Sequence, residues 1–177
     1  MIDPAVGTLL AAAFALLFAS AALHKLLDLE HFAEVVRAYA VVPPVLSRLW
    51  WLVPLAELGV AAGLLASPAH AAVAGTLLLV AYGGVIAINL HRGRHDLSCG
   101  CGGANERRPI AAWMVWRNMV LAAALSVLRL PWAPRPLGAV DLLTIMAGTL
   151  VAALLYMSAD MLLARVAPRT ALLRGSS

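Results

Sequence analysis

The chain has 177 residues, of which 63% are apolar and 12% are charged. A soluble domain has about 45–50% apolar and about 25% charged residues, so this composition and a mean hydropathy of +0.89 exclude an ordinary water-soluble globule and a disordered chain. The net charge of +4 comes from basic residues near the ends of apolar stretches, which indicates membrane orientation and no nucleic-acid partner. We predict one integral-membrane domain over residues 1–177, embedded in the lipid bilayer.

Five apolar stretches approach the about 20 residues that a helix needs to cross a membrane. In chain order they are residues 4–23 with an extension to 27, 49–66, 69–90, 110–128 and 137–163. The first lacks a basic region before it, so we interpret it as a span and not as a signal peptide. The sequence predicts an all-α membrane protein, a compact bundle of about five transmembrane helices with a four-helix core plus a C-terminal span.

Residues 28–44, between the first two stretches, carry a different pattern. Apolar side chains at helical spacing alternate here with charged ones: Leu29, Phe32, Val35, Val36 and Tyr39 beside Glu30, Glu34 and Arg37. This predicts an amphipathic helix at the membrane interface. Tyr39, like Trp113 and Trp116, is expected to anchor the chain at that interface. We predict that residues 168–177 form a loose basic tail.

The distribution of basic residues predicts the orientation. If five spans alternate, ten of the 13 Lys and Arg residues flank the first loop, the third loop or the C-terminal tail, and only Arg129 and Arg135 flank the opposite ends. Because cytoplasmic loops carry an excess of Lys and Arg, we expect the N-terminus outside, the C-terminus in the cytoplasm and the loop of residues 91–109 on the cytoplasmic side.

Both cysteines lie in that loop, as Cys99–Gly100–Cys101. Two thiols so close together form a disulfide only as a small ring, whose dihedral and Cα separation are hard to satisfy; Gly100 gives the backbone the freedom to form it. A strained disulfide is readily reduced, which favours thiol–disulfide exchange. We interpret Cys99 and Cys101 as a redox pair.

Two other interpretations of the cysteines are compatible with the residues. They are unpaired thiols in a glycine-rich turn, or they belong to a zinc or copper site. The ligands of that site would be His91, His95, Cys99 and Cys101. Against it, Cys-x-Cys is tighter than the usual zinc spacing, and Arg92 and Arg94 would crowd a cation.

Ionisable residues inside spans are costly, which indicates a function for each. Glu57 lies about eight residues into the second span, close to the bilayer centre; Lys25 closes the first span, and Arg117 lies about two turns into the fourth. With alternating spans, Lys25, Arg117 and the cysteine loop share one half of the membrane. Either cation would lower the pKa of a nearby thiol and activate it. Alternatively, an ion pair of Glu57 with Arg117 or Lys25 would fix helix packing.

The order of these residues resembles the methylamine utilisation protein MauE family, which is similar to DoxX-type membrane proteins. The resemblance covers roughly residues 8–125. It rests on His24–Lys25, Tyr39 with Pro43, Glu57, Asn89 with Arg92–Gly93, Cys99–Gly100–Cys101 and Arg117–Asn118. The chain departs from the family at Gly102–Gly103, where the family commonly has an aromatic residue and then glycine.

The resemblance implies a bacterial inner-membrane protein needed to make methylamine dehydrogenase, a periplasmic enzyme whose small subunit carries several disulfides and a tryptophan tryptophylquinone. It also implies a thioredoxin-like partner, MauD-like, so that the chain would be the membrane half of a thiol–disulfide relay. The charge count puts the cysteine loop on the cytoplasmic side, whereas this partner and client are periplasmic. Either the loop is re-entrant and reached from both sides, or the orientation is the opposite one.

Two further functions are compatible with the sequence, and whether the chain is an enzyme is left open. The first is a disulfide oxidoreductase that passes electrons to a membrane quinone, although such enzymes generally use a second cysteine pair and this chain has none. The second is a non-redox scaffold or a His/Cys metal-binding protein. No cofactor is assigned with certainty; a quinone would belong to the first alternative.

Overall fold

The computed structural model describes residues 1–41, 48–98 and 109–174. In this part of the chain there are six α-helices and one 3-10 turn: α1 (Pro4–Leu27), α2 (Leu29–Tyr39), α4 (Leu52–Ala66), α5 (Pro68–His91), α6 (Ala112–Ser126), η1 (Val127–Arg129) and α7 (Ala139–Arg174). The extended pairs among the described residues are two isolated bridges, Ile2 with Trp132 and Ser98 with Pro109. The fold is therefore all-α, as the composition predicts.

Local signals set where the first helices begin and end. The Asp3 side chain accepts a hydrogen bond from the Ala5 amide at 2.8 Å, and Pro4 occupies the first position of α1, where its missing N–H costs nothing. Asp28 separates α1 from α2 and caps α2 by accepting from the His31 amide at 3.2 Å. The α2 helix ends at Tyr39, and the next residue, Ala40, caps it with a left-handed backbone of φ 48°.

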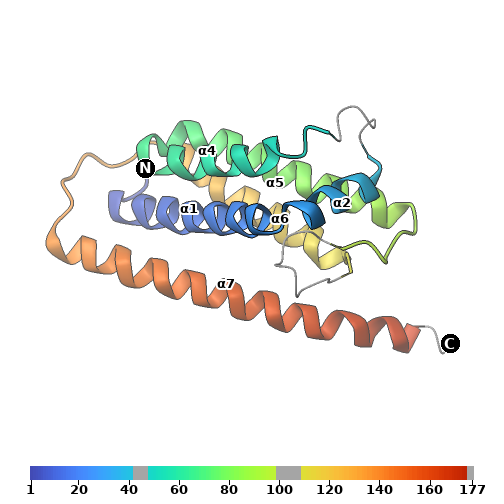
Figure 1. The fold of residues 1–177 in the computed structure, drawn as a ribbon. Coiled ribbons are helices and arrows are strands. Elements are labelled where there is room, and N and C mark those ends of the chain that lie inside the picture. The colour runs from blue at the N-terminus through green and yellow to red at the C-terminus, as the bar shows by residue number, and fades with distance from the viewer. Residues whose placement is uncertain (42–47, 99–108, 175–177) are drawn as a thin grey trace.

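Helices α1, α4, α5 and α6 form a bundle, and α7 lies along its outside against α1 (Figure 1). The centre of the bundle is apolar, with Phe18, Leu64, Leu125 and Leu128 at most 1% exposed. Gly75 permits the close approach of α5, because a Cβ there would lie 2.7 Å from Leu125 Cδ2. The described residues thus contain a four-helix bundle and one further helix after it in the chain.

Three of the described helices are long and apolar enough to cross a membrane: Pro4–Leu27, Pro68–His91 and the Ala139–Leu163 part of α7. This is an all-α membrane protein. Helices α4 and α6 have 15 residues each and rise about 22 Å, which is less than the about 30 Å of the hydrocarbon core. The number of five spans stays a prediction.

One end of the bundle gathers the residues that the sequence singles out. The end of α1, the helix α2, the chain on both sides of residues 99–108 and the beginning of α6 meet there, while the N-terminus and the chain between η1 and α7 lie at the other end (Figure 1). Glu57 belongs to the part of α4 nearer to this first end. Since α4 begins at Leu52, this carboxylate lies in the second turn of the helix and not at its middle.

Candidate functional site

Cys99 and Cys101 lie outside the described residues, but the chain on both sides of them is described. Ser98 and Pro109 form an antiparallel bridge, and the Ile110 amide donates to the Leu97 carbonyl at 2.9 Å. The residues that enter and leave the cysteine-bearing segment are therefore held together at its base.

These flanking residues are buried on a small apolar cluster, which we call the loop platform: Val35, Tyr39, Ile86, Leu97, Ile110 and Met114. Leu97 is 8% and Ile110 is 2% exposed. Three helices contribute the other members, α2, α5 and α6. Burial of the two flanking side chains anchors both ends of the cysteine-bearing segment on the bundle.

Two arginines attach the C-terminal end of α2 to the chain after α5. Arg92 Nη1 donates to the Ala40 carbonyl at 3.2 Å, and Arg94 Nη1 lies 3.5 Å from the Tyr39 carbonyl. The last carbonyls of a helix lack partners within it, and arginine satisfies them while complementing the helix dipole. These contacts hold α2 over the loop platform.

The same turn explains the Asn-x-x-Arg-Gly motif. Asn89 is fully buried; its Nδ2 donates to the Val85 carbonyl at 3.1 Å, and its Oδ1 lies 3.4 Å from Arg94 Nη1. Gly93 has φ of +71°, a left-handed conformation that glycine adopts without strain. The motif thus shapes the turn that directs Arg92 and Arg94 toward α2.

Lys25 and Glu57 form a buried ion pair between α1 and α4. Lys25 Nζ lies 2.6 Å from Oε1 and 2.8 Å from Oε2 of Glu57, and the two side chains are 6% and 0% exposed. The Tyr82 hydroxyl on α5 donates to Oε1 at 2.8 Å. Of the two ion pairs considered for Glu57, the structure forms the one with Lys25.

Two aromatic rings lie close to this ammonium group. Lys25 Nζ lies 5.6 Å from the ring centroid of Phe32 and 5.5 Å from that of Tyr82, within the range of a cation–π interaction. Trp50 meets Phe32 edge-on, with centroids 6.3 Å apart. Sequence reasoning assigned no role to Tyr82, and Phe32 was only one apolar position of an amphipathic pattern. Both lie on other helices than Lys25 and Glu57, α5 and α2, so no local spacing signal connects them to the ion pair.

Arg117 pairs with an acid on the outer helix. Its Nη1 lies 2.6 Å from Asp160 Oδ1 on α7, with side-chain exposures of 16% and 24%. Its guanidinium also lies 5.3 Å from the ring centroid of Trp113. The sequence suggested no role for Asp160, an acid near the end of the last span. Arg117 thus links α6 to α7.

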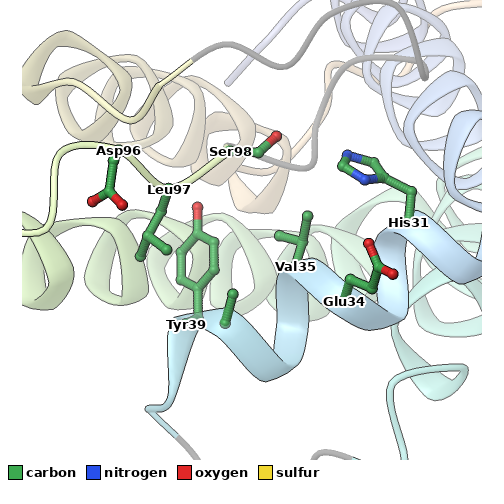
Figure 2. Close-up of a pocket in the computed structure, with 8 residues that line it drawn as sticks. His31, Glu34, Val35, Tyr39, Asp96, Leu97 and Ser98 are labelled. Atoms are coloured by element: carbon green, nitrogen blue, oxygen red, sulfur yellow. The ribbon is translucent and has the colours of Figure 1, made fainter.

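A cavity of about 240 Å³ opens between α2 and the chain just before the cysteines (Figure 2). It is lined by His31, Glu34, Val35, Ala38, Tyr39, Asp96, Leu97 and Ser98. Tyr39 directs its ring toward Leu97 (Figure 2) and is 7% exposed. The sequence predicted Tyr39 as an interfacial anchor; in the structure its side chain belongs to the loop platform. The adjoining Ser98 Oγ is buried and has no hydrogen-bond partner among the described residues.

The histidines of the alternative metal site lie at the same end. His91 is the last residue of α5, and His95 follows the Gly93 turn. No group of three or more His, Cys, Asp or Glu residues suited to a metal occurs within the ranges that the structure describes. The two cysteine ligands of that site lie outside those ranges, so the metal site stays a prediction.

Comparison with known proteins gives consistent matches. Residues 3–132 match the profile of the family described as "Methylamine utilisation protein MauE". Proteins named "Methylamine utilization protein MauE" are 38% identical over 97% of this chain and 94% of the relative in Paracoccus denitrificans, and 44% identical over 90% and 88% in Paracoccus versutus. A relative of that name in Methylophilus methylotrophus is 32% identical over 90% and 87%. No solved structure matches the chain.

Proposed function

Because the chain belongs to the methylamine utilisation protein MauE family, we propose that it is a membrane thiol–disulfide relay protein of methylamine utilisation. Cys99 and Cys101 exchange with a thioredoxin-like, MauD-like partner in the bacterial inner membrane. The relay supports disulfide formation in a periplasmic client such as the small subunit of methylamine dehydrogenase.

The observation that carries this proposal is the anchoring of the cysteine-bearing segment. The only two cysteines of the chain stand between Ser98 and Pro109, which pair with each other, and between Leu97 and Ile110, which are buried on the loop platform. Thiol–disulfide exchange needs an accessible thiol presented in a fixed direction to its partner. A segment tied at its base to a rigid bundle suits that requirement.

Each exchange needs no reactant besides the partner. One cysteine thiolate attacks the partner disulfide, which forms a mixed disulfide and releases a partner thiolate. The second cysteine then attacks the mixed disulfide, closes the Cys99–Cys101 ring and leaves the partner as a dithiol. In this direction two electrons and two protons pass to the partner. The reverse steps, in which a partner dithiol reduces the Cys99–Cys101 disulfide, leave the partner oxidised; this is the direction that disulfide formation in the client requires, and a further two-electron acceptor must then reoxidise the pair.

Lys25, Glu57 and Arg117 support this chemistry by holding the bundle. The Lys25 charge is balanced by Glu57 at 2.6 Å, and the Arg117 charge by Asp160 at 2.6 Å. A cation already paired at this distance attracts a thiolate less than a free one. These contacts favour the packing role over direct activation of a thiol.

Redox trapping in cells tests the proposal. After an acid quench, alkylation should separate a dithiol and a disulfide population of the wild-type protein, and Cys99→Ser or Cys101→Ser should abolish the second population and the disulfides of the client. Ser98→Ala is the matched control, because it changes a neighbouring side chain and keeps both thiols. The relay would be contradicted, and a scaffold favoured, if the wild-type protein carried only thiols or if both cysteine variants left the client disulfides normal. A separate metal analysis of the purified protein would favour the His/Cys site if it found a bound metal.

A further inference from the structure

We propose that Phe32 is a positioning residue for the base of the cysteine-bearing segment, Leu97 and Ile110: it links the buried Lys25–Glu57 ion pair to the loop platform through α2. The inference rests on the proposed function of the cysteines and adds a route by which the ion pair bears on the residues that flank them. The route has three steps, from ion pair to ring, from ring to helix face, and from helix face to the flanks of the cysteine-bearing segment.

The first step starts from a fixed ammonium group. Lys25 Nζ is held by both carboxylate oxygens of Glu57, and the Tyr82 hydroxyl holds the carboxylate from the other side. Displacement of Lys25 or Glu57 would leave the other charge without its partner in the bundle interior, and displacement of Tyr82 would remove a hydrogen bond from the carboxylate; both are costly. The position of Nζ is therefore set by three helices, α1, α4 and α5.

The second step is the packing of the Phe32 ring. Its ring centroid lies 5.6 Å from Lys25 Nζ, Trp50 meets the ring at an interplanar angle of 76°, and the side chain is 7% exposed. Phe32 belongs to the first turn of α2, just after the break at Asp28. A ring held on one side by a cation and on another by an indole fixes the lateral and rotational position of this short helix.

The third step follows from helical spacing. Val35 and Tyr39 lie three and seven residues after Phe32, so the three side chains share one face of α2. Val35 and Tyr39 belong to the loop platform, against which Leu97 and Ile110 are buried. A rotation or shift of α2 at Phe32 is therefore transmitted to the residues on either side of the cysteine-bearing segment.

A variant at Phe32 separates this route from a general loss of stability. In the full-length protein in lipid nanodiscs, Phe32→Leu keeps an apolar side chain and the Lys25 charge but removes the ring. Phe14→Leu is the matched control, since Phe14 is 6% exposed and lies in the central core instead. Loss of a buried cation–π contact should speed hydrogen exchange of the Ile110 amide and alkylation of the reduced cysteines roughly fivefold or more, with no such change in Phe14→Leu.

Equal rates in Phe32→Leu and Phe14→Leu would overturn the inference. If Phe32→Leu does not fold, Tyr82→Phe decides. This variant keeps both rings near Lys25 and removes the hydroxyl that donates to Glu57, and unchanged rates at Ile110 and the cysteines would count against the route. Failure of the proposed function is seen separately. It shows as an absence of cysteine disulfide in wild-type cells, whereas the exchange rate of Ile110 reports the Phe32 route whether or not the cysteines cycle.

Discussion

At the scale of single residues, the membrane bundle keeps its buried charges by pairing them. Lys25 and Glu57 are joined at 2.6 Å with a tyrosine hydroxyl on the same carboxylate, so each charge has compensation where water is excluded. A buried pair stabilises little against an apolar replacement, but loss of one partner is costly because the other charge stays buried.

Glu57→Gln should therefore lower the free energy of unfolding by about 3–5 kcal/mol. The double variant Lys25→Met with Glu57→Leu should recover much of that loss, since no charge is left behind. Denaturant titration in detergent micelles measures both, and Glu34→Gln, at an exposed position of α2, is the control. A single variant as stable as the wild type would show that the ion pair does not form.

Gly93 is at a second position where the choice of side chain is restricted, in this case by the backbone conformation. With φ of +71°, Gly93→Ala should destabilise the protein by roughly 1–2 kcal/mol through left-handed backbone strain. Gly84 has no atom within 4 Å of an added Cβ and lies inside α5, so Gly84→Ala should be neutral or stabilising by up to about 1 kcal/mol. Thermal unfolding of the two variants compares them; equal effects would contradict the role of the turn.

At the scale of helices, the sequence predicted the elements well and their partners less well. Apolar runs located α1, α5 and the start of α7 within a few residues, because this signal is local. The pairing of Arg117 with Asp160 joins residues 43 positions apart, and no spacing rule connects them. The same holds for Tyr82, whose role depends on how α5 packs on α4.

Another contact between elements fastens the N-terminal end of the bundle. Arg135 donates to Asp3 from Nε and Nη2, both at 2.8 Å, and to Asp141 at the start of α7. Hydrogen bonding from Arg135, followed by that from the Ala5 amide, holds the pKa of Asp3 below its ordinary value. This exposed group ties the cap of α1 to the chain before α7.

The lowered pKa of Asp3 gives a pH dependence with a definite sign. Its stabilising contribution is present above the unfolded pKa of about 3.9 and is lost as the pH falls through the lower folded value. The melting temperature of Arg135→Gln should lie slightly below that of the wild type near neutral pH and approach it in acid, with a smaller gap at high salt. Arg129→Gln, at a nearby exposed position, controls for loss of a positive charge. A gap that grows in acid would contradict the assignment.

At the scale of the whole molecule, the two ends of the bundle differ in their number of Lys and Arg residues. The end that carries the cysteine segment holds the last turns of α1 and α2 and the chain after α5, and therefore Lys25, Arg37, Arg92 and Arg94. The opposite end holds η1 and the chain before α7, and therefore Arg129 and Arg135. Helix α7 has 36 residues and a length of about 54 Å, so it extends beyond a hydrocarbon core of about 30 Å. Its C-terminal end lies on the more basic side (Figure 1).

This asymmetry predicts that the cysteine end faces the cytoplasm, because basic residues are retained there. A fluorescent protein fused after the last residue should fluoresce, and alkaline phosphatase inserted between Arg129 and Gly138 should be active in the periplasm.

The reverse pattern would place Cys99 and Cys101 directly within reach of a periplasmic partner. The predicted pattern requires instead that the anchored segment be reached through the bundle, since the loop platform and the partner then lie on opposite sides of the membrane. Labelling of both cysteines by a membrane-impermeant maleimide from each side distinguishes these cases, and labelling from the cytoplasm alone would contradict exchange with a periplasmic partner.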